Sequence, residues 1–402
     1  MITSFAPNST AKDVLIALSY LCLPWRWFSL RTGSNAIQVE KQLEDYFGLE
    51  NSVITMDSGR TALYLALKSL GVGPGDEVIL QAFTCVVVPN AIKHTGATPI
   101  YADIDANSTN FDPNKLEQVI TKKSRAIIVQ HTFGLAADLD PILKIADKYK
   151  LKVIEDCAHS LGSEYKGKKL GTFGDASIFS FGVDKVISSV RGGALLTKEP
   201  ELYKKIRASS LPKLPLKIVL KHLFHLPIFA LGKTLYPFYL GKILLYLSKK
   251  IGLTALIIES KEKRCEPVSW FPAQFPNSLA AVAKNQIQGL DEANAHRKKI
   301  AAFYKRSLPD YEHPPMKDHI FLRYPLRSKH RDELIEKARR HGVFLGNWYT
   351  SVVAPQDSDL ASVDYRIGQC KTAERMTKEI FNLPTHRGIN LKKAQEIVDL
   401  IS

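Results

Sequence analysis

Short apolar runs alternate with amphipathic helical patterns along the first half of the chain, and glycines, prolines and polar residues separate them. The segments between the runs repeat apolar residues every three or four positions, as helices with one buried face do. Strands that alternate with helices predict a mostly parallel sheet covered on both faces, hence an α/β fold. The predicted strands lie at 53–56, 78–80, 99–102, 126–129, 153–154, 178–181 and 194–197.

After residue 270 the pattern continues with helices and fewer strands. We expect one long helix at 277–304, shorter helices at 331–341 and 391–401, and strands at 321–326 and 343–345. This combination indicates a small C-terminal α+β domain. The predicted organisation is an N-terminal apolar arm (1–35), a large α/β domain (36–209), an insertion (210–265) and the small domain (266–402).

The N-terminal arm is apolar and aromatic over residues 14–30, but Pro24 and Arg26 interrupt it. The stretch is too short and broken for a membrane-spanning helix. It also lacks the basic start and the small-residue cleavage site of a signal peptide. An arm that packs in an oligomer or lies at an interface is the better interpretation.

The insertion at 210–265 has ten basic residues and two acidic ones, and its leucines and aromatic residues interleave with lysines. Prolines and glycines interrupt every run before it could span a bilayer. A basic amphipathic pattern favours a membrane-surface contact through 211–258 or a hydrophobic lid. A buried helical insertion that packs on a second subunit is the alternative. Nucleic-acid binding rests on the charge alone and is not the expected function, because the segment is rich in leucine, not arginine, and carries no binding motif.

Composition narrows the function classes. The 402 residues include 55 lysines and arginines against 40 acidic residues, which gives a net charge of +15 and suggests anionic partners. Five cysteines lie far apart without a CxxC pair, so neither a metal site nor a disulfide framework is indicated. This cysteine usage fits a reducing cytoplasm.

Three residues meet the chemical demands of one cofactor. Pyridoxal phosphate needs a carboxylate on its ring nitrogen, a lysine on its aldehyde carbon, and donors around its phosphate. Asp156 follows a buried strand, and Lys185 lies on a short loop between strands, where desolvation frees its amine for covalent chemistry. Ser180 precedes that lysine and supplies a hydroxyl. Alone, Asp156 could be a turn residue and Lys185 a surface lysine; together they favour the cofactor.

Several segments also look familiar as a set. They are SGRTALYLAL at 58–67, the stretches 73–105 and 155–174, and SFGVDK at 180–185 with the RGG that follows. In these segments the chain resembles the DegT/StrS family of pyridoxal-phosphate-dependent sugar aminotransferases, which have the aspartate-aminotransferase fold. The resemblance covers about residues 36–207 and 270–402. It implies a fold-type-I transferase with a seven-stranded, mostly parallel sheet.

The resemblance also implies roles for residues around the phosphate. The turn into the helix after residue 58 holds the cofactor phosphate in this family, which points to Gly59 and to Arg60 as a charged clamp. Arg60 directed to solvent or to another subunit remains an alternative. Ser180 matches a serine that contacts the phosphate.

Around the cofactor ring, the resemblance assigns Lys185 as the catalytic Schiff-base lysine and Asp156 as the partner of the ring nitrogen. His159 matches a residue near the phenolic oxygen. The family usually places an aromatic residue where Cys85 stands here. Either Phe83 stacks on the ring instead, or Cys85 lies against it.

The implied activity is transfer of an amino group, by resemblance from glutamate, to a keto-sugar nucleotide or a related glycoconjugate precursor. The presence of the lysine argues against the family's dehydratase branch, where histidine replaces it. We expect a cytoplasmic homodimer, with a peripheral contact at the inner face of the membrane left open. The alternatives are a pyridoxal-phosphate enzyme acting on a non-sugar or lipid-linked substrate, and a non-catalytic, membrane-associated member of the fold.

Overall fold

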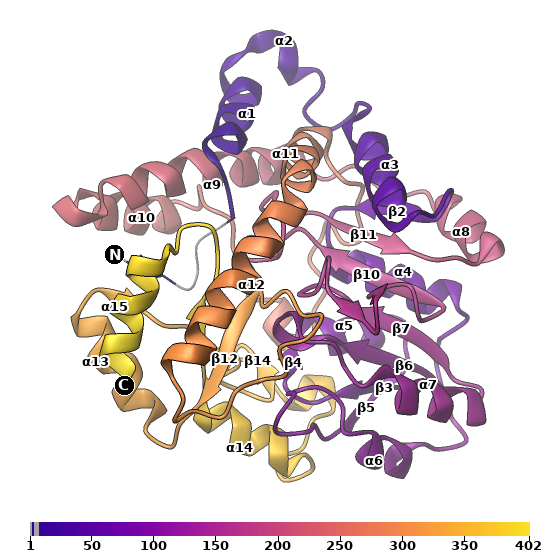
Figure 1. Cartoon of the computed structure of the whole chain (residues 1–402). Coiled ribbons are helices and arrows are strands. Elements are labelled where there is room, and N and C mark those ends of the chain that lie inside the picture. The colour runs from indigo at the N-terminus through magenta and orange to yellow at the C-terminus, as the bar shows by residue number, and fades with distance from the viewer. Residues whose placement is uncertain (1, 4–7) are drawn as a thin grey trace.

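A seven-stranded sheet forms the centre of the computed structural model, which describes residues 2–3 and 8–402 (Figure 1). Its neighbours are all parallel except β11, which runs antiparallel to the strands on either side of it. The mostly parallel, seven-stranded α/β sheet predicted from the sequence is thereby confirmed. In spatial order the strands are β2 (Val53–Met56), β11 (Gly193–Leu196), β10 (Ala176–Ser180), β7 (Lys152–Asp156), β6 (Ser124–Gln130), β3 (Glu77–Gln81) and β5 (Thr98–Ala102).

Helices cover both faces of the sheet, because successive side chains of each strand point to opposite faces. On β6, Ile127 and Val129 join the buried cluster under one layer of helices, whereas Ile128 joins the cluster under the other. The first layer contains α3 (Asn35–Phe47), α7 (Leu139–Lys148) and α11 (Asn277–Gln288). The second contains α4 (Gly59–Ser69), α5 (Val87–Lys93) and α8 (Pro200–Arg207), and α6 (Pro113–Leu116) lies at the sheet's end.

The C-terminal part has its own buried cluster, which includes Tyr304, Tyr324 and Phe381. Its helices are α12 (Leu290–Ser307), α13 (Arg331–Arg340), α14 (Lys371–Glu379) and α15 (Leu391–Ile401). Short strand pairs complete the fold: β12 (Arg323–Arg327) with β15 (Ile380–Pro384), β1 (Ile2–Thr3) with β13 (Val343–Phe344), β14 (Val353–Ala354) with β4 (Thr84–Cys85), and β8 (Glu164–Tyr165) with β9 (Lys168–Lys169).

The single helix predicted at 277–304 is wrong, because the chain forms two helices, α11 and α12, that are separated at Gly289. Glycine weakens a helix interior. Here the Arg387 guanidinium also donates a hydrogen bond to the Gly289 carbonyl at 2.5 Å. The break therefore has a local cause and a tertiary one.

The insertion folds into α9 (Leu216–Thr234) and α10 (Leu240–Lys250), followed by an extended stretch and a short 3-10 turn at Glu262–Arg264. Pro227 and Gly232 do not end α9, which continues as one helix through both residues. Packing offsets the lost backbone hydrogen bond, because α9 buries one face against the N-terminal helix α1 (Ala11–Cys22) and the core. Among the described helices, none is long and apolar enough to cross a bilayer.

Candidate active site

A cavity of about 210 Å³ lies at the carboxyl ends of the parallel strands. Gln130 ends β6, Asp156 ends β7 and Ser180 ends β10, and all three line this cavity. Ligands of open α/β sheets bind at this edge, because side chains at the strand ends project into the space above the sheet. Seven of the eight residues predicted from the sequence line the cavity: Gly59, Arg60, Cys85, Asp156, His159, Ser180 and Lys185.

Lys185 lies on the loop after β10, where its backbone N–H donates to the Gly182 carbonyl at 3.3 Å. Its side chain is buried, and the ammonium nitrogen lies 5.9 Å from the centroid of the Trp348 ring. Burial lowers the pKa of Lys185 below its ordinary value, although the negative charges of Asp184 and Asp156 oppose the shift. Burial therefore makes the Lys185 amine easier to deprotonate than an exposed lysine, which suits a nucleophile.

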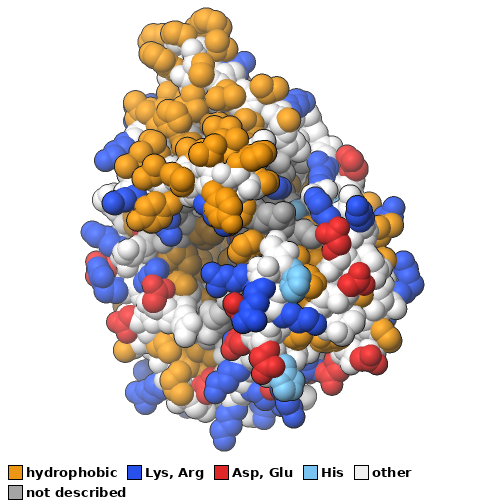
Figure 2. Space-filling view, turned by 90° about the vertical axis from the view of Figure 1, so that its left-hand side faces the viewer, with side chains coloured by type: hydrophobic (Ala, Val, Ile, Leu, Met, Phe, Trp, Pro, Cys, Tyr) orange, Lys and Arg blue, Asp and Glu red, His pale blue; other side chains and the backbone are white. Residues whose placement is uncertain are grey.

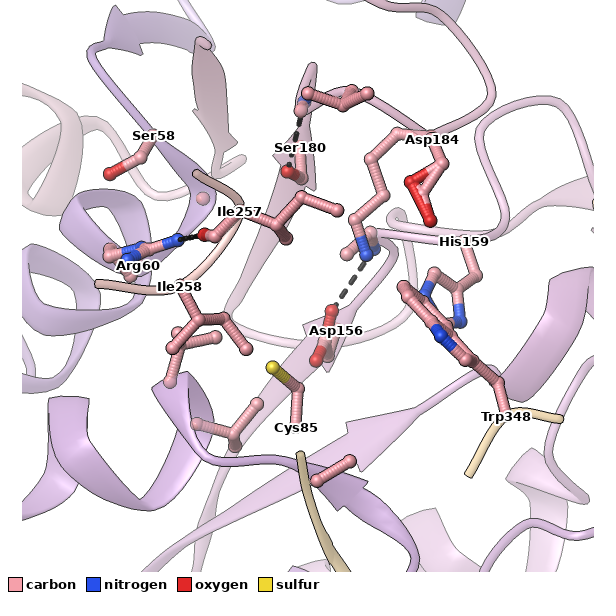
Figure 3. A pocket seen from close by; sticks show the side chains of 18 of the residues that line it. Ser58, Arg60, Cys85, Asp156, His159, Ser180, Asp184, Ile257, Ile258 and Trp348 are labelled. Carbon is pink, nitrogen blue, oxygen red and sulfur yellow. Dashed lines mark hydrogen bonds between the residues drawn. The ribbon is translucent and has the colours of Figure 1, made fainter. Parts of the chain in front are cut away.

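Asp156 points into the same space as Cys85 and His159 (Figure 3). One carboxylate oxygen accepts the Ala158 backbone N–H at 3.0 Å. Burial raises the pKa of the Asp156 carboxyl, while that hydrogen bond and the nearby Lys185 charge act in the other direction. A cation placed beside this carboxylate would offset its desolvation.

The amino terminus of α4 closes one end of the cavity. Ser58 caps the helix, and Gly59 begins it with Ser180 directly alongside. A Cβ at Gly193 would lie 2.4 Å from the Gly59 nitrogen, so only glycine on β11 allows the helix start to approach the sheet this closely. Free backbone N–H groups at a helix start attract anions, so this end suits a phosphate.

Two arginines lie at the same end, and each already has a carboxylate partner. Arg60 forms an ion pair with Glu262 of the insertion and donates to the Ile257 carbonyl at 2.9 Å. Burial, with a smaller effect of Arg191, lowers the pKa of Arg60 to about 10. Arg191 donates through Nε to Asp57 at 2.9 Å. A phosphate clamp by Arg60 stays a prediction, and it would have to compete with Glu262.

The two candidates for ring stacking lie in different surroundings. Cys85 lines the cavity, whereas Phe83 does not: it is fully buried, with its ring edge-on to Tyr349 at 5.2 Å. His159 lines the cavity and accepts the Phe133 backbone N–H through Nδ1 at 3.3 Å. Burial, followed by the charges of Lys185 and Arg323, holds the pKa of His159 well below its usual range, so the ring stays neutral.

Sequence reasoning missed a buried ion pair beside the lysine. Arg323 on β12 donates to the Asp184 carboxylate at 2.6 Å, and its guanidinium lies 3.9 Å from the centroid of the Trp348 ring. Asp184 could have been suspected because it precedes Lys185. Arg323 carried no sequence signal, because only the fold of the C-terminal part places it there.

The insertion also contributes to the cavity wall, through His222 of α9 and the apolar side chains of Leu256, Ile257 and Ile258. Figure 3 shows Ile257 and Ile258 between Arg60 and the space in front of Asp156. Burial lowers the pKa of His222 to about 3, and its Nδ1 lies 2.6 Å from the Ile218 carbonyl oxygen. Part of the pocket is thus built by the insertion, for which the sequence had left a membrane-surface contact, a hydrophobic lid and a buried helical insertion as alternatives.

A second group of buried side chains, His131, Glu155 and Cys157, lies under the cavity floor. The Glu155 oxygens accept hydrogen bonds from the backbone N–H groups of Gly171, Phe173 and Gly174. His131 Nε2 lies 3.2 Å from the Glu155 Oε2 atom. These bonds occupy the carboxylate, so the group reads as a hydrogen-bond network and not as a metal site.

Comparisons with known proteins agree with this geometry. The family model described as the DegT/DnrJ/EryC1/StrS aminotransferase family matches residues 22–215 and 265–402. GDP-perosamine synthase of Caulobacter vibrioides is 29% identical over 381 residues, covering 92% of this chain and 89% of that protein. The pleiotropic regulatory protein of Geobacillus stearothermophilus is 31% identical over 354 residues, covering 86% and 82%.

Solved structures show the same fold. The putative sugar aminotransferase Spr1654 of Streptococcus pneumoniae, in its PLP form, superposes with a TM-score of 0.76 at 20% identity over 99% of this chain and 97% of that one. The resemblance stated from the sequence is confirmed. The chain belongs to the DegT/DnrJ/EryC1/StrS aminotransferase family.

Proposed function

We propose that this aminotransferase uses pyridoxal phosphate to move an amino group from a donor, glutamate by family resemblance, to a keto-sugar nucleotide or a related glycoconjugate precursor. The observation that carries the proposal is the placement of Lys185 and Asp156 on the wall of one buried cavity that ends at the start of α4. The printed activities of the relatives, GDP-perosamine synthases among them, support a sugar acceptor.

The residues present fit this cofactor. Asp156 is a buried carboxylate whose raised pKa reflects desolvation, and a ring nitrogen carrying a proton would stabilise its charge. Lys185 is a buried amine with a lowered pKa, which suits a covalent bond to an aldehyde. The α4 start and the Ser180 hydroxyl offer donors to a phosphate at the cavity end.

When bound, the cofactor supplies an electron sink for the carbon that loses its proton. The residues of this chain do the rest. Lys185 would hold the cofactor and, as a free amine, would take the proton from the donor Cα. Asp156 would keep a proton on the ring nitrogen. Cys85 lies where it can contact the ring, and neutral His159, whose Nδ1 already accepts the Phe133 N–H, can donate a hydrogen bond through Nε2 to the ring's phenolic oxygen.

At the phosphate end, Gly59 contributes its backbone N–H, Ser180 its hydroxyl, and Arg60 a charge that Glu262 shares. The cavity wall supports a contact from Cys85 more directly than one from Phe83, which lies behind it. The proposal includes both residues, with Cys85 beside the ring and Phe83 behind Cys85. The Cys85→Ser and Phe83→Leu variants would separate the two, since only a residue in contact with the ring should shift the cofactor's absorbance.

We further propose that the enzyme acts in the cytoplasm as a homodimer, with a peripheral position at the inner face of the membrane through residues 211–258. Family membership supports the first part. The absence of acidic residues from 210–258 supports the second, because anionic lipid headgroups attract lysines.

The test is spectroscopic. Purified protein mixed with pyridoxal phosphate should turn yellow, and Lys185→Ala should not; glutamate should then bleach the colour while 2-oxoglutarate appears. A panel of nucleotide-linked and lipid-linked keto sugars added next identifies the acceptor by the return of colour. A protein that binds the cofactor but does not respond to any amino donor would contradict aminotransfer and favour a non-catalytic member of the fold.

A further inference from the structure

Two segments that lie outside the family match meet in space. The family model omits residues 1–21 and 216–264, and these hold nearly all of α1 together with α9 and α10. Helix α1 packs beside α9 (Figure 1). Ala17 and Tyr20 of α1 share a buried cluster with Val219 and Leu223 of α9. The additions therefore form one structural unit, with an inner side that packs on the protein and an outer side that does not.

The outer side is apolar and aromatic. We call it the docking face and define it by its most informative members: Trp25, Phe28, Tyr239, Ile243, Tyr246 and Ile251. Their exposed fractions run from 54% for Ile243 to 91% for Phe28. Figure 2 looks onto this side and shows hydrophobic side chains gathered over α1 and the short helix α2 (Pro24–Trp27), and again below them over α9 and α10. Exposure on this scale marks an interaction surface.

Lysines accompany these side chains. Residues 210–258 contain seven lysines and no aspartate or glutamate. The ammonium of Lys242 lies 4.3 Å from the centroid of the Tyr239 ring, and Lys249 and Lys250 end α10. Aromatic residues beside lysines are the composition of protein surfaces that lie in the headgroup region of membranes.

The charge decides between the two occupants that an apolar face could have. A second copy docked face to face would bring Lys242, Lys249 and Lys250 of α10 against the same lysines of that copy, with no acidic residue on α10 to balance them. An anionic phospholipid surface supplies the opposite charge and accepts the aromatic side chains as well. Because none of the described helices can span a bilayer, the contact would lie in the plane of the surface.

We infer that the docking face binds the surface of an anionic phospholipid bilayer, with α1–α2 and α9–α10 lying in its headgroup region. This inference deepens the peripheral position included in the proposed function by naming the surface and its partner. The same insertion carries Leu256 and Ile257, which are partly exposed and also line the cavity. Docking therefore places the cavity mouth beside the membrane, where an acceptor bound to a lipid carrier or held near the surface would enter.

The experiment uses the full-length, cofactor-loaded protein and two kinds of vesicle, phosphatidylcholine alone and phosphatidylcholine with about one third phosphatidylglycerol. Sedimentation measures the bound fraction. One variant removes apolar side chains (Phe28→Ser with Tyr246→Ser and Ile251→Ser), and a second removes charge (Lys242→Gln with Lys249→Gln and Lys250→Gln). The matched control is Ile367→Ser, because Ile367 is 73% exposed but lies next to α14, at the other end of the molecule (Figure 1).

We expect the protein to sediment with the anionic vesicles and not with the neutral ones. Loss of three lysines should weaken binding on the order of a hundredfold, and binding should also fall with added salt. The apolar variant should lose binding to a similar degree, whereas Ile367→Ser should match the unaltered protein. The donor half-reaction, followed by cofactor colour in vesicle-free buffer, should be unchanged in all variants.

Equal binding to both kinds of vesicle, or binding that neither triple variant reduces, would overturn the inference. A third result would also overturn it: the unaltered protein does not sediment with vesicles, and the triple variants change the number of subunits measured by analytical ultracentrifugation. The docking face would then join subunits. Each of these failures leaves the cofactor colour intact, so it is distinguishable from a failure of the proposed aminotransfer.

Discussion

The cavity and the docking face differ in which kind of side chain is buried and which is exposed. In the cavity, charged groups are buried and held in pairs: Asp57 with Arg191, Asp184 with Arg323, and Glu262 with Arg60. On the docking face, large apolar side chains are left in contact with water. Each arrangement costs free energy unless a partner completes it, because buried charges need counter-charges and exposed apolar surface needs cover.

The two regions also differ in whether the family model matches the segments that build them. Segments within the matched ranges 22–215 and 265–402 supply Lys185, Asp156 and the start of α4, so the proposed chemistry lies in the part shared with relatives. The unmatched segments supply most of the docking face and one wall of the cavity. The proposed reaction centre thus lies within the ranges that the family model matches, and one wall of its entrance lies outside them.

The largest expected effect is on the reaction centre. Asp156→Asn keeps the shape of the side chain but removes the charge that the ring nitrogen requires. We expect the rate of the donor half-reaction to fall on the order of a thousandfold, while vesicle binding is unchanged. Stopped-flow absorbance measures the first, and sedimentation measures the second. A rate within a few-fold of the original would break the proposed role of Asp156.

The next effect concerns buried pairing. Asp184→Ala leaves the Arg323 guanidinium buried without this carboxylate, and we expect the free energy of unfolding to fall by about 3–5 kcal/mol. The matched control is Glu201→Ala, which breaks an exposed ion pair with Lys204 and should cost under about 1 kcal/mol. Urea denaturation compares them. Similar losses in both variants would show that the cavity pair has no special weight.

Acid should affect the inner side of the insertion. Burial lowers the pKa of His225 on α9 from 6.5 to about 4, and neither ring nitrogen has a hydrogen-bond partner among the described residues. The folded-state pKa lies below the unfolded one, so the unfolded chain takes up the proton first. The stability that neutral His225 allows is complete above pH 6.5 and is lost as the pH falls toward 4.

Between pH 7.5 and pH 5, the free energy of unfolding should therefore fall by about 2 kcal/mol less in His225→Leu than in the original protein. Denaturant titrations at both pH values measure this difference. The exposed His330→Leu serves as the control for removal of a histidine. A His225→Leu variant with the original pH dependence would contradict a buried neutral ring.

The smallest effect is on the stability of the docking face itself. Phe28 is 91% exposed, so Phe28→Ser should change the free energy of unfolding by less than about 0.5 kcal/mol. Leu223 lies on the inner side of α9 and is fully buried, so Leu223→Ala should cost about 2–5 kcal/mol. Thermal or urea unfolding compares the two. A large loss in Phe28→Ser would show that the face is covered within the protein.

The sequence was most informative where the signal is local. Short apolar runs that alternate with helical patterns predicted the sheet, and an aspartate, a serine and a lysine near strand ends predicted Asp156, Ser180 and Lys185 as site residues. The family resemblance added Gly59, which lines the same cavity. These features depend on residues close together in the chain.

Contacts between distant segments were not predictable. Arg323 reaches Asp184 only because the C-terminal part folds against the sheet, and Glu262 reaches Arg60 only because the insertion returns across the cavity. The continuity of α9 through Pro227 likewise depends on packing against α1, which propensity alone does not contain. From the sequence, Phe83 and Cys85 are equally good candidates for contact with the ring. Only the folded chain places Cys85 on the cavity wall and Phe83 in the buried core behind it.

The most direct test of the account is to trap the lysine. The protein is incubated with pyridoxal phosphate, reduced with borohydride and digested, and the modified peptide is identified by mass spectrometry. We predict a phosphopyridoxyl group on Lys185 in nearly every chain. In Asp156→Asn protein that is treated with excess glutamate before the reduction, Lys185 should lose this label only if the donor reaction still proceeds. Label spread over other lysines, or no label on Lys185, would contradict the central claim.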